Sequence, residues 1–166
     1  MALLKHGPEA ILDAELEKLL SRVYVEGGFT DAEVAQRSLD AASVRARGDL
    51  IAAYAIPGDA LAGMVMVVLP SSPARRIARE YEGELHLLAV LPEFRGQGIG
   101  AQLVEAAVER ARTAGLAGLV LWTQPSMTAA QRLYQAHGFV RRPERDALLK
   151  PPPGRSFLVF ERSLRE

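Results

Sequence analysis

Apolar residues recur at two spacings along this chain, and these spacings separate predicted helices from predicted strands. A spacing of three or four residues is typical of one face of a helix, and it occurs over Pro8 to Tyr24, Ala101 to Ala114 and Thr128 to Ala136. The segment Thr30-Asp31-Ala32-Glu33 has the pattern of a capping box. A further helix is therefore predicted to begin there and to end near Arg45.

Continuous apolar runs bounded by turn residues predict the strands. They are Leu50 to Ile56, Leu61 to Leu69, Glu84 to Val90, Leu119 to Thr123, Phe139 to Val140 and Phe157 to Phe160. The first two should form a hairpin, because Pro57-Gly58-Asp59 has turn chemistry. The strands that begin at Glu84 and Leu119 should run parallel, because one helix connects them. The polar segment Pro70 to Glu82 is predicted as a loop, with a short helix over Ala74 to Tyr81 as the alternative.

The order of these elements predicts an α+β fold: one mixed, mostly antiparallel sheet with helices on both faces and a central βαβ unit. At 166 residues the chain is most simply a single domain, residues 1–166. Its 20 Lys and Arg residues balance 20 Asp and Glu residues. Sequence-independent binding to nucleic acid is therefore not expected.

Cysteine is absent, which excludes disulfides and thiolate metal sites. The histidines His6, His86 and His137 lie too far apart in sequence to suggest a metal motif, so no metal is expected. No apolar stretch approaches the ~20 residues of a membrane helix, and the first ten residues lack a long apolar signal segment. These features predict a cytoplasmic protein without a membrane partner, either a monomer or a homodimer.

A glycine-rich segment, Arg95-Gly96-Gln97-Gly98-Ile99-Gly100, connects a predicted strand to a predicted helix. The first N–H groups of a helix lack intrahelical partners and carry partial positive charge, so this order can bind a phosphate. The segment has neither the Gly-Lys-Ser/Thr end of a P-loop nor the spacing of a dinucleotide-binding turn. Two interpretations remain: a diphosphate site for another phosphorylated ligand, and an ordinary glycine-rich connection.

Two motifs together resemble the GNAT superfamily of N-acetyltransferases. Arg95, Gly98 and Gly100 fill the family's Gln/Arg-x-x-Gly-x-Gly/Ala signature, which lies between a strand and a helix. The segment Ala129 to Phe139 is similar to the second motif, a Leu-Tyr pair followed by Gly-Phe. The close match covers Glu84 to Val140. Two independent motifs at the expected separation are more specific than either motif alone.

The resemblance implies that acetyl-CoA is the acyl donor, with its pyrophosphate on the amides of Gln97 to Ala101 and Arg95 at the start of the loop. It also implies that the strand before the loop splays away from the next strand. The pantetheine arm would pair there with backbone groups of Leu88 to Val90, as an added strand. The implied donor-binding residues are Leu88, Ala89, Val90, Arg95, Gly96, Gln97, Gly98, Ile99, Gly100 and Ala101.

Acetyl transfer needs a neutral amine, a polarised thioester oxygen and a protonated leaving thiolate. The resemblance places Tyr134 as the acid that protonates the thiolate, and the alternative is a core tyrosine that packs on the sheet. Glu84 occupies the position at which histone-acetylating members carry a glutamate base, and His86 points to the same face of the strand. Either residue, or the pair, is a candidate base. The alternatives are a solvated strand end for Glu84 and a packed sheet residue for His86.

One position departs from the family pattern. The asparagine that many members carry seven residues before the tyrosine is Met127 here, so a bond to pantetheine must come from Thr123 or Gln124 or be absent. A non-catalytic acyl-CoA-binding sensor is the alternative function. An aminoacyl transferase is disfavoured, because zero net charge offers no tRNA-binding surface.

The sequence does not identify the acceptor amine. The segments expected to select it are Pro8 to Arg45, Pro70 to Glu82 and Arg141 to Arg155. The acidic run of Glu80, Glu82 and Glu84 favours a cationic amine, unless these carboxylates form a solvated face.

Overall fold

The computed structural model describes residues 2–165, and its centre is a seven-stranded sheet in the order β1-β2-β3-β4-β5-β7-β6. The strands are β1 (Ala2–His6), β2 (Asp49–Ala55), β3 (Leu61–Val68), β4 (Glu82–Val90), β5 (Gly118–Thr123), β6 (Val140–Arg141) and β7 (Leu158–Ser163). Only β4 and β5 pair in parallel; the other neighbours are antiparallel. The predicted hairpin of β2 and β3 and the central βαβ unit are confirmed.

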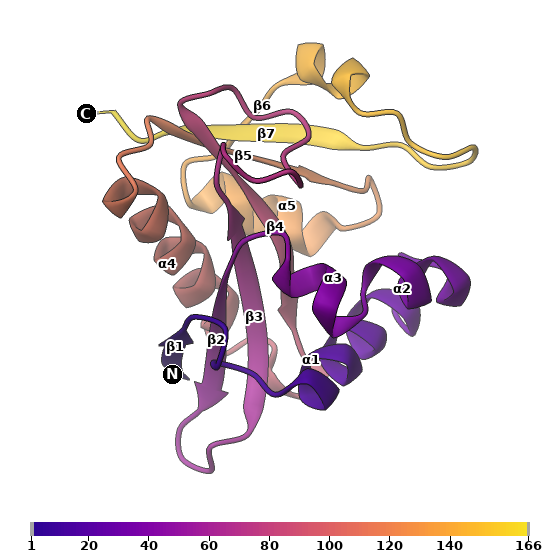
Figure 1. The fold of residues 1–166 in the computed structure, drawn as a ribbon, viewed down its shortest axis with the longest axis vertical. Coiled ribbons are helices and arrows are strands. Elements are labelled where there is room, and N and C mark those ends of the chain that lie inside the picture. The colour runs from indigo at the N-terminus through magenta and orange to yellow at the C-terminus, as the bar shows by residue number, and fades with distance from the viewer. Residues whose placement is uncertain (1, 166) are drawn as a thin grey trace.

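Helices cover both faces of the sheet, with α4 on one side and α1 to α3 on the other (Figure 1). The helical elements are α1 (Asp13–Leu20), η1 (Ser21–Val25), α2 (Ala32–Ser38), α3 (Ala41–Arg45), η2 (Pro92–Phe94), α4 (Ile99–Thr113), α5 (Thr128–Ala136) and η3 (Pro143–Leu148). Among residues 2–165, no helix is long and apolar enough to span a membrane. The predicted α+β fold class is confirmed.

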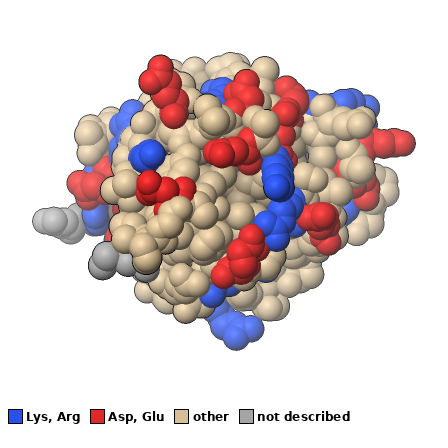
Figure 2. All heavy atoms as spheres, turned by 90° about the horizontal axis from the view of Figure 1, so that it is seen from below, with Lys and Arg blue, Asp and Glu red and all other residues tan. Residues whose placement is uncertain are grey.

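Alternate residues of one strand enter two different cores, as the twofold period of a strand requires. Ile51 and Ala53 of β2 pack with α4, whereas Leu50 and Ala52 pack with α1 and α3. The α4 side also contains Tyr134 of α5. On the surface, acidic and basic side chains are mixed on the face seen from below (Figure 2), in keeping with a formal net charge of zero.

The first 45 residues contain most of the differences from the predicted elements. The strand β1 was not predicted, because its ALLKH sequence does not alternate between apolar and polar residues. It is an edge strand whose polar residues Lys5 and His6 are exposed. The predicted helix over Pro8 to Tyr24 begins only at Asp13, since Ala10 and Ile11 are buried against the sheet before it. It then ends in the π-helical turn η1.

The second predicted helix is two helices, because the chain breaks between Ser38 and Ala41 to bury Leu39. The predicted capping box is wrong: Asp31 is the N-cap residue of α2, and no side chain caps the helix. Between Pro70 and Glu82 the chain is a loop, so the alternative of a short helix is also wrong.

The gap between β4 and β5 is the feature of the sheet that matters most for the site. These strands pair only from Glu82 to Glu84, although both continue beyond that point. A bulge also interrupts the pairing of β4 with β3, where Leu87 and Leu88 face one residue of β3 and Leu87 has a φ of 53°. A non-glycine residue rarely adopts this left-handed conformation. The bulge re-aims the backbone of β4 beside the gap.

At the short paired segment of β4 and β5, a buried ion pair connects η3 to β4 and β7. Arg145 is 3% exposed, and its Nη2 donates to Glu82 Oε1 at 2.9 Å. Its Nη1 donates to Glu82 Oε2 at 3.0 Å and to Glu161 Oε2 at 2.7 Å. Glu82 is 4% exposed, so its charge depends on this one guanidinium for an ionic partner.

Candidate functional site

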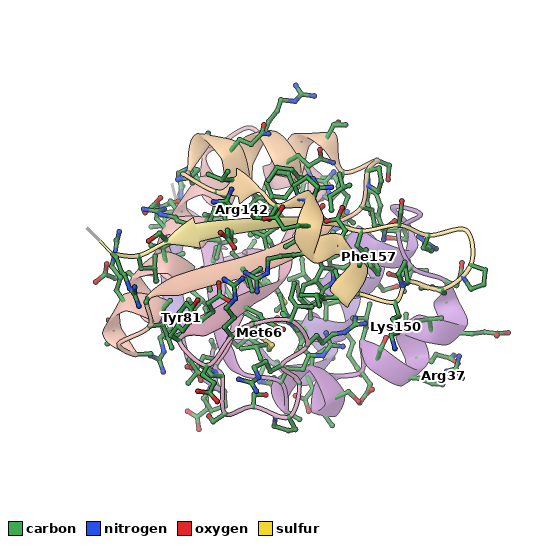
Figure 3. All side chains as sticks on the ribbon, turned by 90° about the horizontal axis from the view of Figure 1, so that it is seen from above. Arg37, Met66, Tyr81, Arg142, Lys150 and Phe157 are labelled. Carbon is green, nitrogen blue, oxygen red and sulfur yellow. The ribbon has the colours of Figure 1, made fainter. Side chains whose placement is uncertain are left out.

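A cavity of about 1110 Å³ follows the gap between β4 and β5. At one end it reaches the glycine-rich loop and the N-terminus of α4, and its wall continues over α5. At the other end it is bounded by η1, the segment after it, and the loop of residues 73–76. Phe157, just before β7, belongs to this wall; Figure 3 shows it on the same side of the molecule as Arg37 of α2, away from Tyr81.

The glycine-rich loop presents free backbone groups to this cavity. Gly98 is the N-cap residue of α4 with a φ of 79°, and no heavy atom lies within 4 Å of where its Cβ would be. The first helical bond joins the Gln102 N–H to the Gly98 carbonyl at 3.1 Å. The N–H groups of Ile99, Gly100 and Ala101 therefore precede the hydrogen-bonded ladder and carry the positive end of the helix dipole.

Two residues hold this loop in place. Arg95 Nε donates to the Val90 carbonyl at 3.0 Å, which joins the start of the loop to the end of β4. A Cβ on Gly100 would lie 3.1 Å from Leu133 Cδ2 of α5, so α4 and α5 approach closely at this point. The arrangement leaves an open, electropositive concavity of the kind that binds a phosphate.

Most residues expected to bind the donor line the cavity. They are Leu88, Val90, Arg95, Gly96, Gly98, Ile99, Gly100 and Ala101. Ala89 and Gln97 do not line it: Ala89 is buried in the opposite core, and Gln97 is exposed. The Leu88 carbonyl already accepts a hydrogen bond from the Tyr24 hydroxyl at 2.9 Å. A carbonyl oxygen has two lone pairs, so this one retains one for a ligand.

Tyr134 is almost fully buried, at 6% exposed, yet it lines the cavity. Its ring packs against Phe139 and Phe160, with centroid distances of 5.8 and 6.4 Å. Among residues 2–165 its hydroxyl has no hydrogen-bond partner. Burial raises the pKa of this phenol above its ordinary value, so the hydroxyl is protonated and able to donate at neutral pH.

Glu84 and His86 form a pair, with 2.8 Å between Glu84 Oε1 and His86 Nε2. Glu84 is 0% exposed, so a solvated strand end is excluded. Its other oxygen, Oε2, accepts the backbone N–H groups of residues 76, 77 and 78 at 2.7 to 2.8 Å. Burial alone would raise the pKa of Glu84, but these hydrogen bonds together with His86 lower it below the ordinary value. The side chain is thus a fixed, ionised acceptor.

His86 lines the cavity, whereas Glu84 does not. An ionised carboxylate can only accept a hydrogen bond, so it fixes the proton of a neutral imidazole on Nε2. Nδ1 of His86 is then an acceptor with no partner among residues 2–165. The Trp122 ring meets the imidazole edge to face at a centroid distance of 5.0 Å.

The other acidic residues of this segment do not form a negative surface. Glu82 is buried against Arg145, and neither Glu80 nor Glu82 lines the cavity. The predicted solvated face is therefore wrong for Glu82 as well as for Glu84. The acidic run supplies no carboxylate that a cationic acceptor could contact in the cavity.

Met127 is the position at which the sequence departs from the family pattern, and the polar side chains near it bond to other groups of this chain. Thr123 Oγ1 donates to the Met127 sulfur at 3.2 Å. Gln124 donates through Nε2 to the Phe29 carbonyl at 2.9 Å and accepts from Arg155 through Oε1 at 3.1 Å. Both predicted substitutes for the asparagine line the cavity, and both already have partners within the chain.

The cavity residues that the sequence did not single out include Tyr24, Arg47, Arg76 and Trp122. Tyr24 and Arg76 lie in two of the segments expected to select the acceptor. Tyr24 stood within a predicted apolar helix face, and Arg47 and Arg76 stood in segments without a motif. Trp122 gave the one usable signal, because the only tryptophan of the chain interrupts an otherwise aliphatic strand. In residues 2–165, no group of three or more His, Cys, Asp or Glu side chains could hold a metal.

This chain is similar in sequence to one known family and to several curated relatives. The model described as "Acetyltransferase (GNAT) family" matches residues 14–139. An uncharacterized N-acetyltransferase of Archaeoglobus fulgidus is 46% identical over 66 residues, which are 40% of this chain and 44% of that protein. A mycothiol acetyltransferase of Thermobispora bispora is 41% identical over 59 residues, 36% of this chain and 20% of that protein. The match covers less than half the length of either relative.

Solved structures are similar over almost the whole chain. An acetyltransferase of the GNAT family from Staphylococcus aureus has a TM-score of 0.76 at 14% identity, covering 99% of this chain and 100% of that one. An acetyltransferase from Bacillus subtilis in complex with CoA has a TM-score of 0.69 at 22% identity, with coverage of 99% and 100%. At these identities the likeness shows the fold, and the bound CoA belongs to that protein.

Proposed function

Because this chain belongs to the acetyltransferase (GNAT) family, we propose that it transfers an acetyl group from acetyl-CoA to a primary amine. The observation that carries the proposal is one continuous cavity that joins the N-terminus of α4 to Tyr134 and His86. An anion site, a protonated hydroxyl and an imidazole acceptor thus share one space. Detection of an N-acetylated product by mass spectrometry tests the proposal.

The donor-binding half of the cavity is formed by α4, β4 and α5. The N–H groups of Ile99, Gly100 and Ala101 would bind the pyrophosphate of acetyl-CoA, with Arg95 beside them. The edge of β4 around Leu88 is not paired with β5, so it offers backbone groups to the amide-containing arm. These contacts would place the thioester near Tyr134.

The reaction divides between two side chains. The amine nitrogen attacks the thioester carbonyl, a C–N bond forms, and the C–S bond breaks. His86 Nδ1 accepts the proton that the nitrogen sheds, directly or through water. The Tyr134 hydroxyl donates to the departing sulfur, which leaves as the thiol, and the phenol regains its proton from the one released by the amine. The products are the N-acetylated amine and CoA.

The alternative is a non-catalytic acyl-CoA-binding sensor on the same fold. The glycine-rich loop is common to both functions. Met127, whose sulfur accepts a hydrogen bond from Thr123, is compatible with either function. The hydroxyl of Tyr134 and Nδ1 of His86 favour the enzyme, because both polar atoms meet the cavity without a partner among the described residues.

Gly98→Asp is expected to weaken acetyl-CoA binding by about tenfold or more, since a like charge about 4 Å from a phosphate costs on the order of 1–4 kcal/mol. Gly98→Asn has nearly the same shape without the charge and should lose less affinity. Gly115→Asp is the matched control: its φ of 77° and open surroundings equal those of Gly98, at the other end of α4. Calorimetry measures all three. Equal affinity of Gly98→Asp and Gly115→Asp would place the pyrophosphate elsewhere.

Glu84→Gln is expected to lower kcat/KM by about 10²-fold or more, the range of a lost general base. The Gln carbonyl can accept the loop N–H groups, but its NH2 then faces His86 Nε2. The imidazole proton is thereby moved to Nδ1, which can no longer accept one from the amine. Glu105→Gln is the control, because Glu105 also pairs with a histidine, His137, at 2.7 Å but outside the cavity.

The pH profile separates this role from simple selection of neutral amine. Since the pKa of Glu84 lies below its ordinary value, the carboxylate remains charged as the pH falls toward the usual carboxyl range. An acidic limb of kcat/KM near neutral pH therefore does not report protonation of Glu84. The midpoint of this acidic limb is then measured with acceptors of different pKa. If it shifts by the same amount as the acceptor pKa and is unaltered in Glu84→Gln, the Glu84–His86 pair has no catalytic role.

A further inference from the structure

The acceptor end of the cavity contains a surplus of positive charge. Arg47, Arg75 and Arg76 all line it. Within residues 2–165, none of the three lies within ion-pair distance of a carboxylate, although most arginines of this chain do. A fourth, Arg155, lies 3.7 Å from Asp31, the only acidic residue of the wall. The wall therefore has more cations than it can neutralise.

Arg47 shows that this surplus is built in and not merely a solvated surface. Arg75 and Arg76 are exposed, whereas Arg47 is partly buried. Among residues 2–165, the one hydrogen bond of its guanidinium goes from Nη2 to the Ser38 carbonyl at 2.5 Å. Burial lowers the pKa of Arg47, and the nearby charge of Arg76 lowers it further, against the opposite effects of Tyr24 and Asp40. Arg47 and Arg76 both line the cavity, so an anion bound there can accept hydrogen bonds from two guanidinium groups.

Arg76 is also placed close to the proposed chemistry. Its guanidinium lies 5.4 Å from the centroid of the Trp122 ring, and that ring contacts His86. Its backbone N–H donates to Glu84 Oε2 at 2.8 Å. The loop that carries Arg76 is thus fixed by the same carboxylate that orients the imidazole. An anion bound to Arg76 would therefore be separated from the proposed base, His86, by the Trp122 ring.

Beside these charges and a few polar side chains such as Thr30 and Gln124, this end of the wall has a large apolar part. Phe29, Val34, Leu39 and Phe157 line it together with Trp122. These side chains can cover a hydrocarbon or aromatic group, but they offer no hydrogen bond to a second polar group. The chemistry of the wall is therefore an anion site beside an apolar surface.

We propose that the acceptor is a primary amine that carries an anionic group, a carboxylate or a phosphate, on an apolar body. Arg47 and Arg76 bind the anion, and the amine then faces His86. The inference rests on the proposed acetyl transfer, since it identifies the acceptor class of that same site. It replaces the cationic amine that the acidic run favoured, because Glu82 and Glu84 do not reach the cavity.

Two sets of matched amines test the proposal by kcat/KM with acetyl-CoA. The carboxylate set is L-phenylalanine, its amide and 2-phenylethylamine, whose amines are respectively of middle, lower and higher basicity. The phosphate set is O-phosphoethanolamine and ethanolamine. The acid of at least one set is expected to exceed its neutral partners by about 10- to 100-fold, the range of a charge-assisted hydrogen bond. The set that responds identifies the anion.

Variants then assign the preference to the arginines. Arg76→Gln should raise KM for the acid about tenfold or more, whereas KM for its neutral partners and the CoA affinity should change much less. Arg79→Gln is the control, an exposed arginine of the same loop that does not line the cavity. If Arg76→Gln weakens CoA binding instead, the arginines bind a phosphate of the donor and the inference is overturned.

The remaining outcomes distinguish a wrong acceptor class from a failure of acetyl transfer. If neutral amines react as well as the acids, the acceptor class is wrong while acetyl transfer stands. If no amine reacts, acetyl transfer fails, and binding still tests the anion site. Calorimetry with CoA present should then show tighter binding of N-acetyl-L-phenylalanine than of its amide, lost in Arg76→Gln. Equal binding of the two would overturn the site.

Discussion

Replacing Tyr134 with Phe is expected to lower kcat by about 10- to 10⁴-fold while acetyl-CoA binds almost as tightly as before, the pattern of a lost general acid. The substitution removes one oxygen and keeps the ring. Its packing against Phe139 and Phe160 is therefore retained, and the fold should be unaffected. Steady-state kinetics with a saturating acceptor, together with calorimetry of acetyl-CoA, measures both quantities.

Tyr24→Phe is the control for this result. It removes a second hydroxyl from the same cavity, but that hydroxyl is already bonded to the Leu88 carbonyl and is less available to the sulfur. A smaller decrease in kcat is expected. If a folded Tyr134→Phe chain has an unchanged kcat, Tyr134 is a packing residue and the leaving thiolate obtains its proton from water.

Replacing Arg145 with Met is expected to lower the free energy of unfolding by about 3–5 kcal/mol, because it strands a buried carboxylate. Glu82 would keep only the N–H of Arg79 as a partner, and Glu161 would lose one of its two arginines. Methionine nearly conserves the volume, so the loss reports charge and hydrogen bonds more than a cavity. Denaturant unfolding measures the change.

Two further variants test whether the loss of stability comes from the stranded charge of Glu82. Arg142→Met removes the other arginine of Glu161, but the Arg142 side chain is 40% exposed. Exposed pairs contribute only about 0–1 kcal/mol. The double variant Glu82→Gln, Arg145→Met removes the stranded charge and should recover part of the stability. A loss for Arg145→Met no larger than that for Arg142→Met would contradict a stabilising role for the buried pair.

Local sequence patterns were sufficient for the parts of the fold with regular periodicity. The apolar face of α4, the glycine at its end and the parallel pair β4–β5 follow from spacing and connection length alone. The chain before Asp49 was harder, because tertiary contacts override local preference there. Ala10 and Ile11 are buried against the sheet in a segment whose spacing favours a helix, and burial of Leu39 divides the next helix in two.

The residues of the site also separate into those that local patterns could predict and those that depend on tertiary contacts. The loop residues and Tyr134 lie in short motifs, so the sequence could propose them. Spacing by two also placed Glu84 and His86 on one face of the strand. The sequence could not show that loop N–H groups bind Glu84 Oε2, that Arg145 neutralises Glu82 from 63 residues away, or that Arg47 and Arg76 line the same cavity. Those relations depend on contacts between distant segments.

Catalytic acetyl transfer is tested most directly by the stoichiometry of thiol release and acetylated product. The chain is incubated with acetyl-CoA and each amine of the two sets, and CoA thiol is followed with a thiol-reactive dye while mass spectrometry quantifies the N-acetylated amine. We expect one thiol per acetylated amine, with the fastest release for an acid-bearing amine and slower release in Tyr134→Phe and Glu84→Gln. Tight binding of acetyl-CoA without acetylated product from any amine would contradict catalytic acetyl transfer and would favour the non-catalytic sensor.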